Sequence, residues 1–197
     1  METGQTYHIY NHANGSENIF REEENYRFFL KQYKKHLADV VDTYAYCLMP
    51  NHFHFLVKVK EADVLKKNPT FEKLDSLDEI EAKASKQFAN LFISYTMAFN
   101  KKYNRKGSLF MKNFKRKPIE SIEQWQEAFL YIHINPIKHK FSNKIEDWNW
   151  SSWHAYNNME SRSLLARPKA IGYFDNIDNL LYCSEEKRRR ILNMNLE

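Results

Sequence analysis

Apolar and polar residues alternate along three short parts of the chain. This period of two predicts a strand over Thr6 to Asn11 and two further strands over Thr43 to Met49 and His52 to Val59. A Pro50-Asn51 turn separates the last two runs. They are therefore expected to form an antiparallel hairpin.

Other segments carry apolar residues at helical spacing. One such helix is expected to begin at Asn25, and a second contains the stripe from Phe88 to Phe99. Between the hairpin and this stripe, Lys60 to Lys86 mixes lysine with acidic residues and has little apolar periodicity. We interpret it as a solvated insertion or a mobile lid.

A fourth strand is expected within Ser108 to Ile119. Ser121 and Gln124 then resemble a capping box that opens a helix. That helix is expected to stop near Asn135, because Pro136 disfavours helical geometry in the residue before it.

The predicted order is βαββαβα, which indicates an α+β sandwich with helices on a central antiparallel sheet. RNA-recognition domains share this ferredoxin-like order. We expect one domain over residues 1–156, with the insertion at 60–86, and a C-terminal helical tail over 157–197. The final helix is expected around Ser184 to Leu196.

Composition narrows the class of protein. The 197 residues are 43% hydrophobic and 28% charged, with a mean hydropathy of −0.73, which excludes a membrane-embedded protein. An aromatic content of 15% argues against disorder. Cys47 and Cys183 lie far apart and offer neither a disulfide framework nor a cysteine-based zinc ribbon, so a reducing cytoplasm fits best.

Two histidines share one face of the third strand. Because side chains alternate in a strand, His52 and His54 point the same way, about 7 Å apart, while Phe53 and Phe55 point toward the core. Two imidazoles at this spacing can reach one metal ion. The plain alternative is a pair of polar residues on the wetter face of a sheet.

The helix after Ser121 places a phenol and an amide on one face. Tyr131 and Asn135 are four residues apart and lie off the apolar stripe, whereas His133 projects nearer that stripe and is interpreted as structural. Two imidazoles and an amide oxygen suit Mg²⁺ or Mn²⁺ holding a phosphate oxygen. Attack by the tyrosine would then give a covalent phosphotyrosine. The plain alternative is a half-buried tyrosine and a helix-terminal asparagine.

Positive charge is concentrated in one basic window, residues 101–117, although the net charge is only +5. Tyr103, Phe110 and Phe114 are interleaved with cations there, which is typical of a track for phosphates and unpaired bases. The alternative is a solvated helix end followed by a charged edge strand. With no acidic residue in the window, we expect DNA contacts from Lys101, Lys102, Arg105, Lys106, Lys112, Lys115, Arg116 and Lys117.

Five motifs in order along the chain resemble the HUH single-tyrosine transposases, and in particular the REP-associated tyrosine transposases. The motifs are Tyr7-His8-Ile9-Tyr10-Asn11, the run AYCLMPNHFHF from Ala45 to Phe55, Gly107-Ser108-Leu109-Phe110 with Phe114-Lys115, the run YIHINP from Tyr131 to Pro136, and Trp150-Ser151-Ser152.

This resemblance implies an HUH endonuclease domain that nicks and transfers strands of single-stranded or hairpin DNA. Such an enzyme forms a 5′-phosphotyrosine and leaves a free 3′-hydroxyl. The resemblance assigns the divalent cation to His52 and His54, an additional ligand to Asn135 and the nucleophile to Tyr131. It also implies a stem-loop or single-stranded DNA partner, no membrane, a monomer or homodimer, and a nucleoid-associated place in the cytoplasm.

The chain departs from the family pattern at two places. His12 stands where the family often has arginine, and Lys138-His139-Lys140-Phe141 replaces small and apolar residues. Two other functions stay open from the residues alone. One is a non-catalytic nucleic-acid-binding module with the fold of an RNA-recognition domain, and the other is a zinc-dependent hydrolase.

Overall fold

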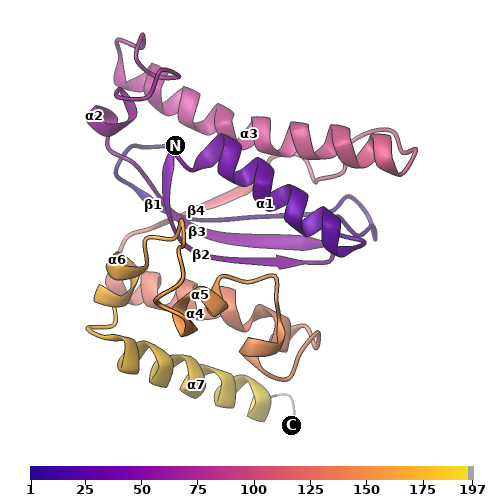
Figure 1. Cartoon of the computed structure of the whole chain (residues 1–197), viewed down its shortest axis with the longest axis vertical. Coiled ribbons are helices and arrows are strands. Elements are labelled where there is room, and N and C mark those ends of the chain that lie inside the picture. The colour runs from indigo at the N-terminus through magenta and orange to yellow at the C-terminus, as the bar shows by residue number, and fades with distance from the viewer. Residues whose placement is uncertain (195–197) are drawn as a thin grey trace.

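The computed structural model describes residues 1–194 and contains a four-stranded antiparallel sheet with helices on both faces (Figure 1). The strand order is β2-β3-β1-β4. The elements are β1 (Thr6–His12), α1 (Glu23–Leu37), β2 (Val41–Met49), β3 (His52–Val59), α2 (Ala62–Leu65), α3 (Leu77–Lys102), β4 (Lys115–Ile119), α4 (Ile122–Lys138), the 3₁₀ turn η1 (Ile145–Asp147), α5 (Trp153–Asn157), α6 (Arg167–Gly172) and α7 (Ile177–Met194). From β1 to α4 this order confirms the predicted α+β sandwich, with the short helix α2 added.

Helices α1 and α3 cover one face of the sheet (Figure 1). Their aromatic side chains pack against alternate residues of β3, so that Phe29 lies 5.5 Å from Phe53 and Tyr33 lies 4.6 Å from Phe55, between ring centroids. These side chains are almost fully buried. The core on this side fixes which face of β3 points inward, and it therefore sends His52 and His54 to the other face.

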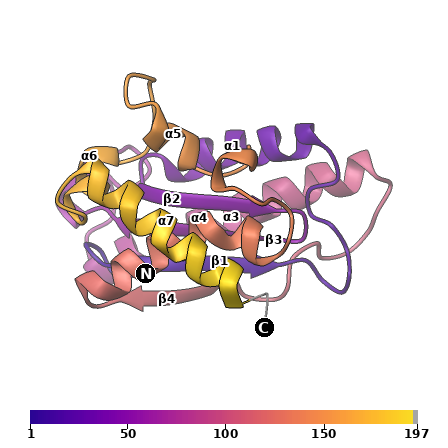
Figure 2. The same cartoon turned by 90° about the horizontal axis from the view of Figure 1, so that it is seen from below.

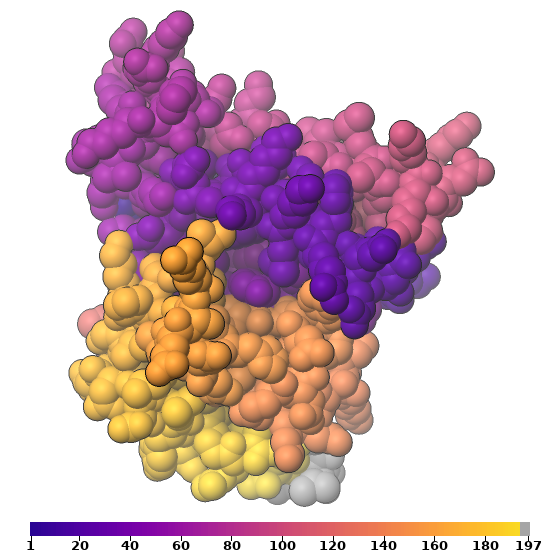
Figure 3. All heavy atoms as spheres, viewed as in Figure 1, coloured from indigo at the N-terminus to yellow at the C-terminus, as the bar shows by residue number. Residues whose placement is uncertain are grey.

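Helix α4 covers that other face, and the tail packs on α4 in turn (Figure 2). The space-filling view shows the tail forming the end of the molecule opposite α1 and α3 (Figure 3). Trp125 and Phe129 of α4 share a second core with Tyr156 of α5 and Phe174 of the tail. None of the helices among residues 1–194 is long and apolar enough to cross a membrane.

We expect Phe174→Ala to lower the free energy of unfolding of the whole chain by about 3–5 kcal/mol, as is usual for a buried phenylalanine. Phe174 is 1% exposed and lies 5.4 Å from Phe129 of α4, between ring centroids, so the substitution would leave a cavity next to α4. Urea denaturation followed by circular dichroism measures the change. A loss below about 1 kcal/mol, or a tail that unfolds in a separate transition, would argue against a shared core.

The fourth strand lies within the predicted segment, at Lys115–Ile119, and pairs with β1. Leu109 and Phe110, earlier in that segment, are buried in the core. Phe110 keeps a single bridge to Ala13.

The predicted end of the helix after Ser121, near Asn135, is wrong. Helix α4 begins as expected, with Ser121 Oγ accepting from Gln124 N, but it continues through Pro136 to Lys138. Pro136 removes one helical donor, yet the last turn is closed by His139 N donating to Asn135 O at 3.0 Å. Burial of Ile137 in the second core further holds this turn against the sheet.

Most side chains of the segment 60–86 are exposed, as expected for a solvated insertion, and a role as a mobile lid stays a prediction. The segment forms α2 and a series of turns that bury Leu65 and Phe71, at 0% and 1% exposure. A full capping box at Ser76 and Glu79 then starts α3 well before the Phe88 stripe.

The division of the chain into residues 1–156 and 157–197 stays a prediction. The predicted final helix falls within α7, and its predicted end at Leu196 lies outside the described residues.

Candidate active site

A cavity of about 550 Å³ lies between the sheet and α4. The antiparallel pairing of β1 and β3 forms the sheet side of this cavity, because His12 pairs with His52 and Tyr10 pairs with His54. Alternation along β1 adds His8 to the same face. The lining residues are His8, Tyr10, His12, His52, His54, Lys117, Ile119, Gln124, Glu127, Ala128, Tyr131, Lys138 and His139.

Five imidazoles gather in this cavity. The His12 ring stacks on His52 with centroids 4.7 Å apart, and His139 meets His52 edge-on at 4.9 Å. His8 Nε2 lies 3.0 Å from His54 Nδ1, within hydrogen-bond distance. The two predicted metal ligands are thus embedded in a histidine cluster that comes from β1, β3 and the end of α4.

The predicted nucleophile lies beside these histidines. The ring of Tyr131 is 5.5 Å from that of His54 and 6.0 Å from that of His8, between centroids. Lys138 Nζ lies 4.9 Å from the centroid of the Tyr131 ring, one face of which it covers. A second tyrosine, Tyr10, lines the same cavity with its ring 5.6 Å from His54.

Burial keeps the central imidazoles neutral at pH 7. Loss of hydration lowers the pKa of His52 to about 3 and that of His8 to about 4. The pKa of His54 is lowered well below its usual range, first by burial and then by repulsion from His8 and His52. A neutral imidazole keeps a lone pair, which is the form that binds a metal ion.

The structure offers a test of whether these residues suit a divalent cation. Asn135 is fully buried on the helix face between Tyr131 and His139, and its Nδ2 donates to Tyr131 O at 3.1 Å. Its Oδ1 has no hydrogen-bond partner, although it is buried. Such an oxygen is costly unless something binds it, and an amide oxygen together with two imidazoles is a donor set that suits a hard cation such as Mg²⁺ or Mn²⁺. Asn135 is not among the residues that line the cavity.

The described residues hold no group of three or more His, Cys, Asp or Glu side chains placed to bind a metal ion. A cation here would therefore take a mixed donor set, in which the third protein ligand is an amide oxygen.

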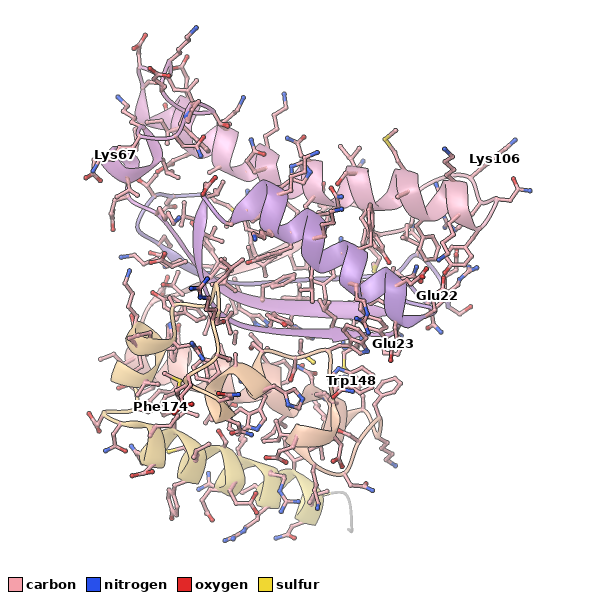
Figure 4. All side chains as sticks on the ribbon, viewed as in Figure 1. Glu22, Glu23, Lys67, Lys106, Trp148 and Phe174 are labelled. Carbon is pink, nitrogen blue, oxygen red and sulfur yellow. The ribbon has the colours of Figure 1, made fainter. Side chains whose placement is uncertain are left out.

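The cations of the basic window lie mainly in two parts of the structure, on β4 and at the end of α3. Lys115 and Lys117 pair with Tyr10 and His8 across β4 and β1, so both share the face of the cavity, while Arg116 points to the opposite face. Lys117 lines the cavity itself. Helix α3 and the loop after it carry Lys101, Lys102, Arg105 and Lys106, and Figure 4 shows Lys106 at the tip beyond α3.

The premise that no acid compensates this window is wrong for two of the eight cations. Lys102 Nζ pairs with Glu22 and Glu24 at 2.5 and 2.7 Å. Arg105 forms a two-point contact with Glu17 at 2.6 and 2.7 Å. These acids lie about 80 residues earlier in the chain, at the start of α1 and just before it, so a local window does not reveal them.

The interleaved aromatic residues pack against the core, with Phe110 buried and Tyr103 and Phe114 half-buried. Phe110 is buried, Phe114 packs on Phe88 with centroids 5.6 Å apart, and Tyr103 packs on Phe99 at 4.6 Å. All three serve the core or its edge. DNA contacts from the exposed cations Lys101, Lys106, Lys112, Lys115, Arg116 and Lys117 stay a prediction.

Sequence reasoning missed His8, Tyr10 and His139 as members of this cavity. The alternation of His8, Tyr10 and His12 in one strand is the signal that could have found two of these. His133, interpreted as structural, is indeed buried, with Nε2 2.7 Å from Ser152 Oγ.

Two comparisons with known proteins confirm the resemblance drawn from the motifs. The chain is 28% identical over 116 residues to a protein of Haemophilus influenzae whose description assigns it provisionally to the REP-associated tyrosine transposases. The match covers 57% of this chain and 59% of that protein. No family model matches the chain.

The second comparison concerns the fold. A solved structure of a REP-associated tyrosine transposase bound to a REP hairpin superposes with a TM-score of 0.53, covering 83% of this chain and 85% of that one. The two sequences are 17% identical, so this likeness shows a shared fold. The chain is thus similar to these transposases in sequence motifs and in architecture.

Proposed function

We propose that this protein is a transposase-type enzyme that nicks and rejoins single-stranded or stem-loop DNA through Tyr131. The observation that carries the proposal is the position of Tyr131, with its ring beside His54 and His8 in a cavity bordered by lysines. A nucleophile, a place for a cation and phosphate-binding charges thus meet at one point.

In the proposed reaction Tyr131 Oη attacks a phosphodiester phosphorus. The bond from phosphorus to the 3′-oxygen breaks, the tyrosine proton leaves Oη and a proton ends on the released 3′-hydroxyl, so a 5′-phosphotyrosine remains. A cation held by His52, His54 and Asn135 would polarise the phosphate, which matters because a free phenol has a pKa of about 10. Attack by a 3′-hydroxyl on the phosphotyrosine reverses the step and rejoins a strand.

The chain's own residues hold the tyrosine in place. Helix α4 fixes its backbone against the sheet, and Lys138 lies over one face of its ring at 4.9 Å. Lys117 and Lys138 border the cavity, where their charges would attract a DNA phosphate.

The two alternative functions have less support from the arrangement. An RNA-recognition domain stacks bases on an open sheet face, whereas both faces of this sheet are covered by helices. A zinc hydrolase needs three strong ligands. Among residues 1–194 no three His, Cys, Asp or Glu side chains are so placed.

Incubation with labelled hairpin DNA tests the proposal directly. With Mn²⁺ or Mg²⁺ we expect cleavage and a DNA-linked protein band that survives a denaturing gel, and chelation by EDTA is expected to remove both. Cleavage that releases a free 5′-phosphate without any covalent band would instead support a water-based hydrolase.

We expect Lys115→Ala and Lys117→Ala to weaken binding of all hairpins alike and to reduce the slope of log K against log salt by about 1 each, because each removes one phosphate contact. Lys102→Ala is the matched control, since Glu22 and Glu24 already neutralise that ammonium. Fluorescence anisotropy at several salt concentrations measures the slopes. Equal slopes for all three variants would contradict a DNA path along β4.

A further inference from the structure

One contact in the cavity joins a residue of unassigned role to a predicted metal ligand. His8 Nε2 lies 3.0 Å from His54 Nδ1. His8 sits on β1 beside Leu56 of β3 and Lys117 of β4, diagonal to His54, and alternation directs it to the α4 side. The contact is thus built by strand register and does not depend on a flexible loop.

Only one proton can lie between these two ring nitrogens. At a separation of 3.0 Å one nitrogen therefore donates and the other accepts. If His54 Nδ1–H donates to His8 Nε2, the proton-free nitrogen of His54 is Nε2. If His8 donates instead, His54 carries its own proton on Nε2 and has no lone pair left for a cation.

His52, the other predicted histidine ligand, also makes a hydrogen bond through Nδ1, and the direction of that bond is fixed by its partner. His52 Nδ1 lies 2.7 Å from Asn51 Oδ1, and a carboxamide oxygen can only accept. His52 is therefore the Nδ1–H tautomer, with its lone pair on Nε2. Metal-binding histidines commonly fix their tautomer by such a bond from the second ring nitrogen.

We infer that His8 is a positioning residue that accepts the Nδ1 proton of His54 and so holds the His54 Nε2 lone pair ready for a cation. His8 would play for His54 the part that Asn51 plays for His52. The inference rests on the proposed function for its purpose, but the tautomer of His54 can be measured without DNA, metal or activity.

The test compares His8→Leu, which keeps bulk but removes the acceptor, with His8→Gln, whose side-chain amide oxygen can accept in place of Nε2. Histidine side-chain nitrogen NMR of the full chain reports which nitrogen of His54 carries the proton. We expect the Nδ1–H tautomer in the wild type and in His8→Gln, and a mixture of both tautomers in His8→Leu.

Affinity for Mn²⁺ alone, measured by electron paramagnetic resonance, gives a second readout. Loss of a hydrogen bond to a ligand histidine typically weakens metal binding by about 10- to 100-fold, so we expect that loss in His8→Leu and recovery in His8→Gln. His154→Leu is the control, because it removes an exposed histidine of α5 that does not line this cavity. Urea denaturation checks that each variant folds.

A wild-type His54 in the Nε2–H tautomer would overturn the inference, as would a His8→Leu protein that keeps both the tautomer and the Mn²⁺ affinity. If His8 controls both but no hairpin is cleaved, the inference about the site stands and the proposed function fails.

Discussion

Replacing Tyr131 with phenylalanine is expected to abolish the covalent DNA adduct and to reduce hairpin cleavage by about 10³-fold or more, since the attacking oxygen is lost. The change should leave the fold intact. Tyr131 is only half-buried, and its hydroxyl makes no hydrogen bond among the described residues. The adduct is measured by the shift of labelled DNA on a denaturing gel, at several enzyme concentrations.

The chain supplies a matched control for this variant. Tyr10 lines the same cavity, with its ring 5.6 Å from that of His54, but it comes from β1 and not from α4. We expect Tyr10→Phe to keep the adduct. If Tyr10→Phe lost it and Tyr131→Phe kept it, the nucleophile would have been assigned to the wrong tyrosine.

Removal of either ligand histidine is expected to have the second large effect. His52→Ala and His54→Ala each delete one of two imidazole ligands, and we expect cleavage to fall by about 10²-fold or more at fixed metal concentration. Affinity for Mn²⁺ should fall in parallel, because the remaining donors are a single imidazole and an amide oxygen. Cleavage rates across a Mn²⁺ titration measure both effects.

His154→Ala is the control for these two variants, because it removes an exposed histidine of α5 that does not line the cavity. It is expected to leave the rate and the metal dependence unchanged. A His54→Ala enzyme that cleaved hairpins at the wild-type rate would show that the His-x-His pair does not bind the required cation.

The elements that depend on local pattern could be predicted from the sequence. Alternation identified β1 and the β2–β3 hairpin, and the same alternation correctly turned Phe53 and Phe55 toward the core and His52 toward the other face. Ser121 marked the start of α4 to the residue. These features follow from interactions between residues close in sequence.

What could not be predicted depends on contacts between distant parts of the chain. The ion pair between Arg105 and Glu17 joins residues 88 positions apart, so the apparently uncompensated window was misjudged. Helix α4 passes Pro136 because burial of Ile137 and a closed last turn offset one missing donor.

The candidate site was also only partly predictable, because it too depends on contacts between distant parts of the chain. The sequence named Tyr131, His52 and His54, but the register of β1 against β3 adds His8 and Tyr10 to the cavity. The continuation of α4 adds His139. Spacing within β1 puts His8 and Tyr10 on one face, but only the register against β3 shows that this is the face of His52 and His54.

The most direct test of the central claim is to identify the amino acid to which DNA becomes attached. The adduct formed with hairpin DNA and Mn²⁺ would be digested with nuclease and trypsin, and the modified peptide sequenced by mass spectrometry. We expect a nucleotide linked through its 5′-phosphate to Tyr131. Attachment at Tyr10 or any other residue, or linkage through a 3′-phosphate, would contradict the mechanism.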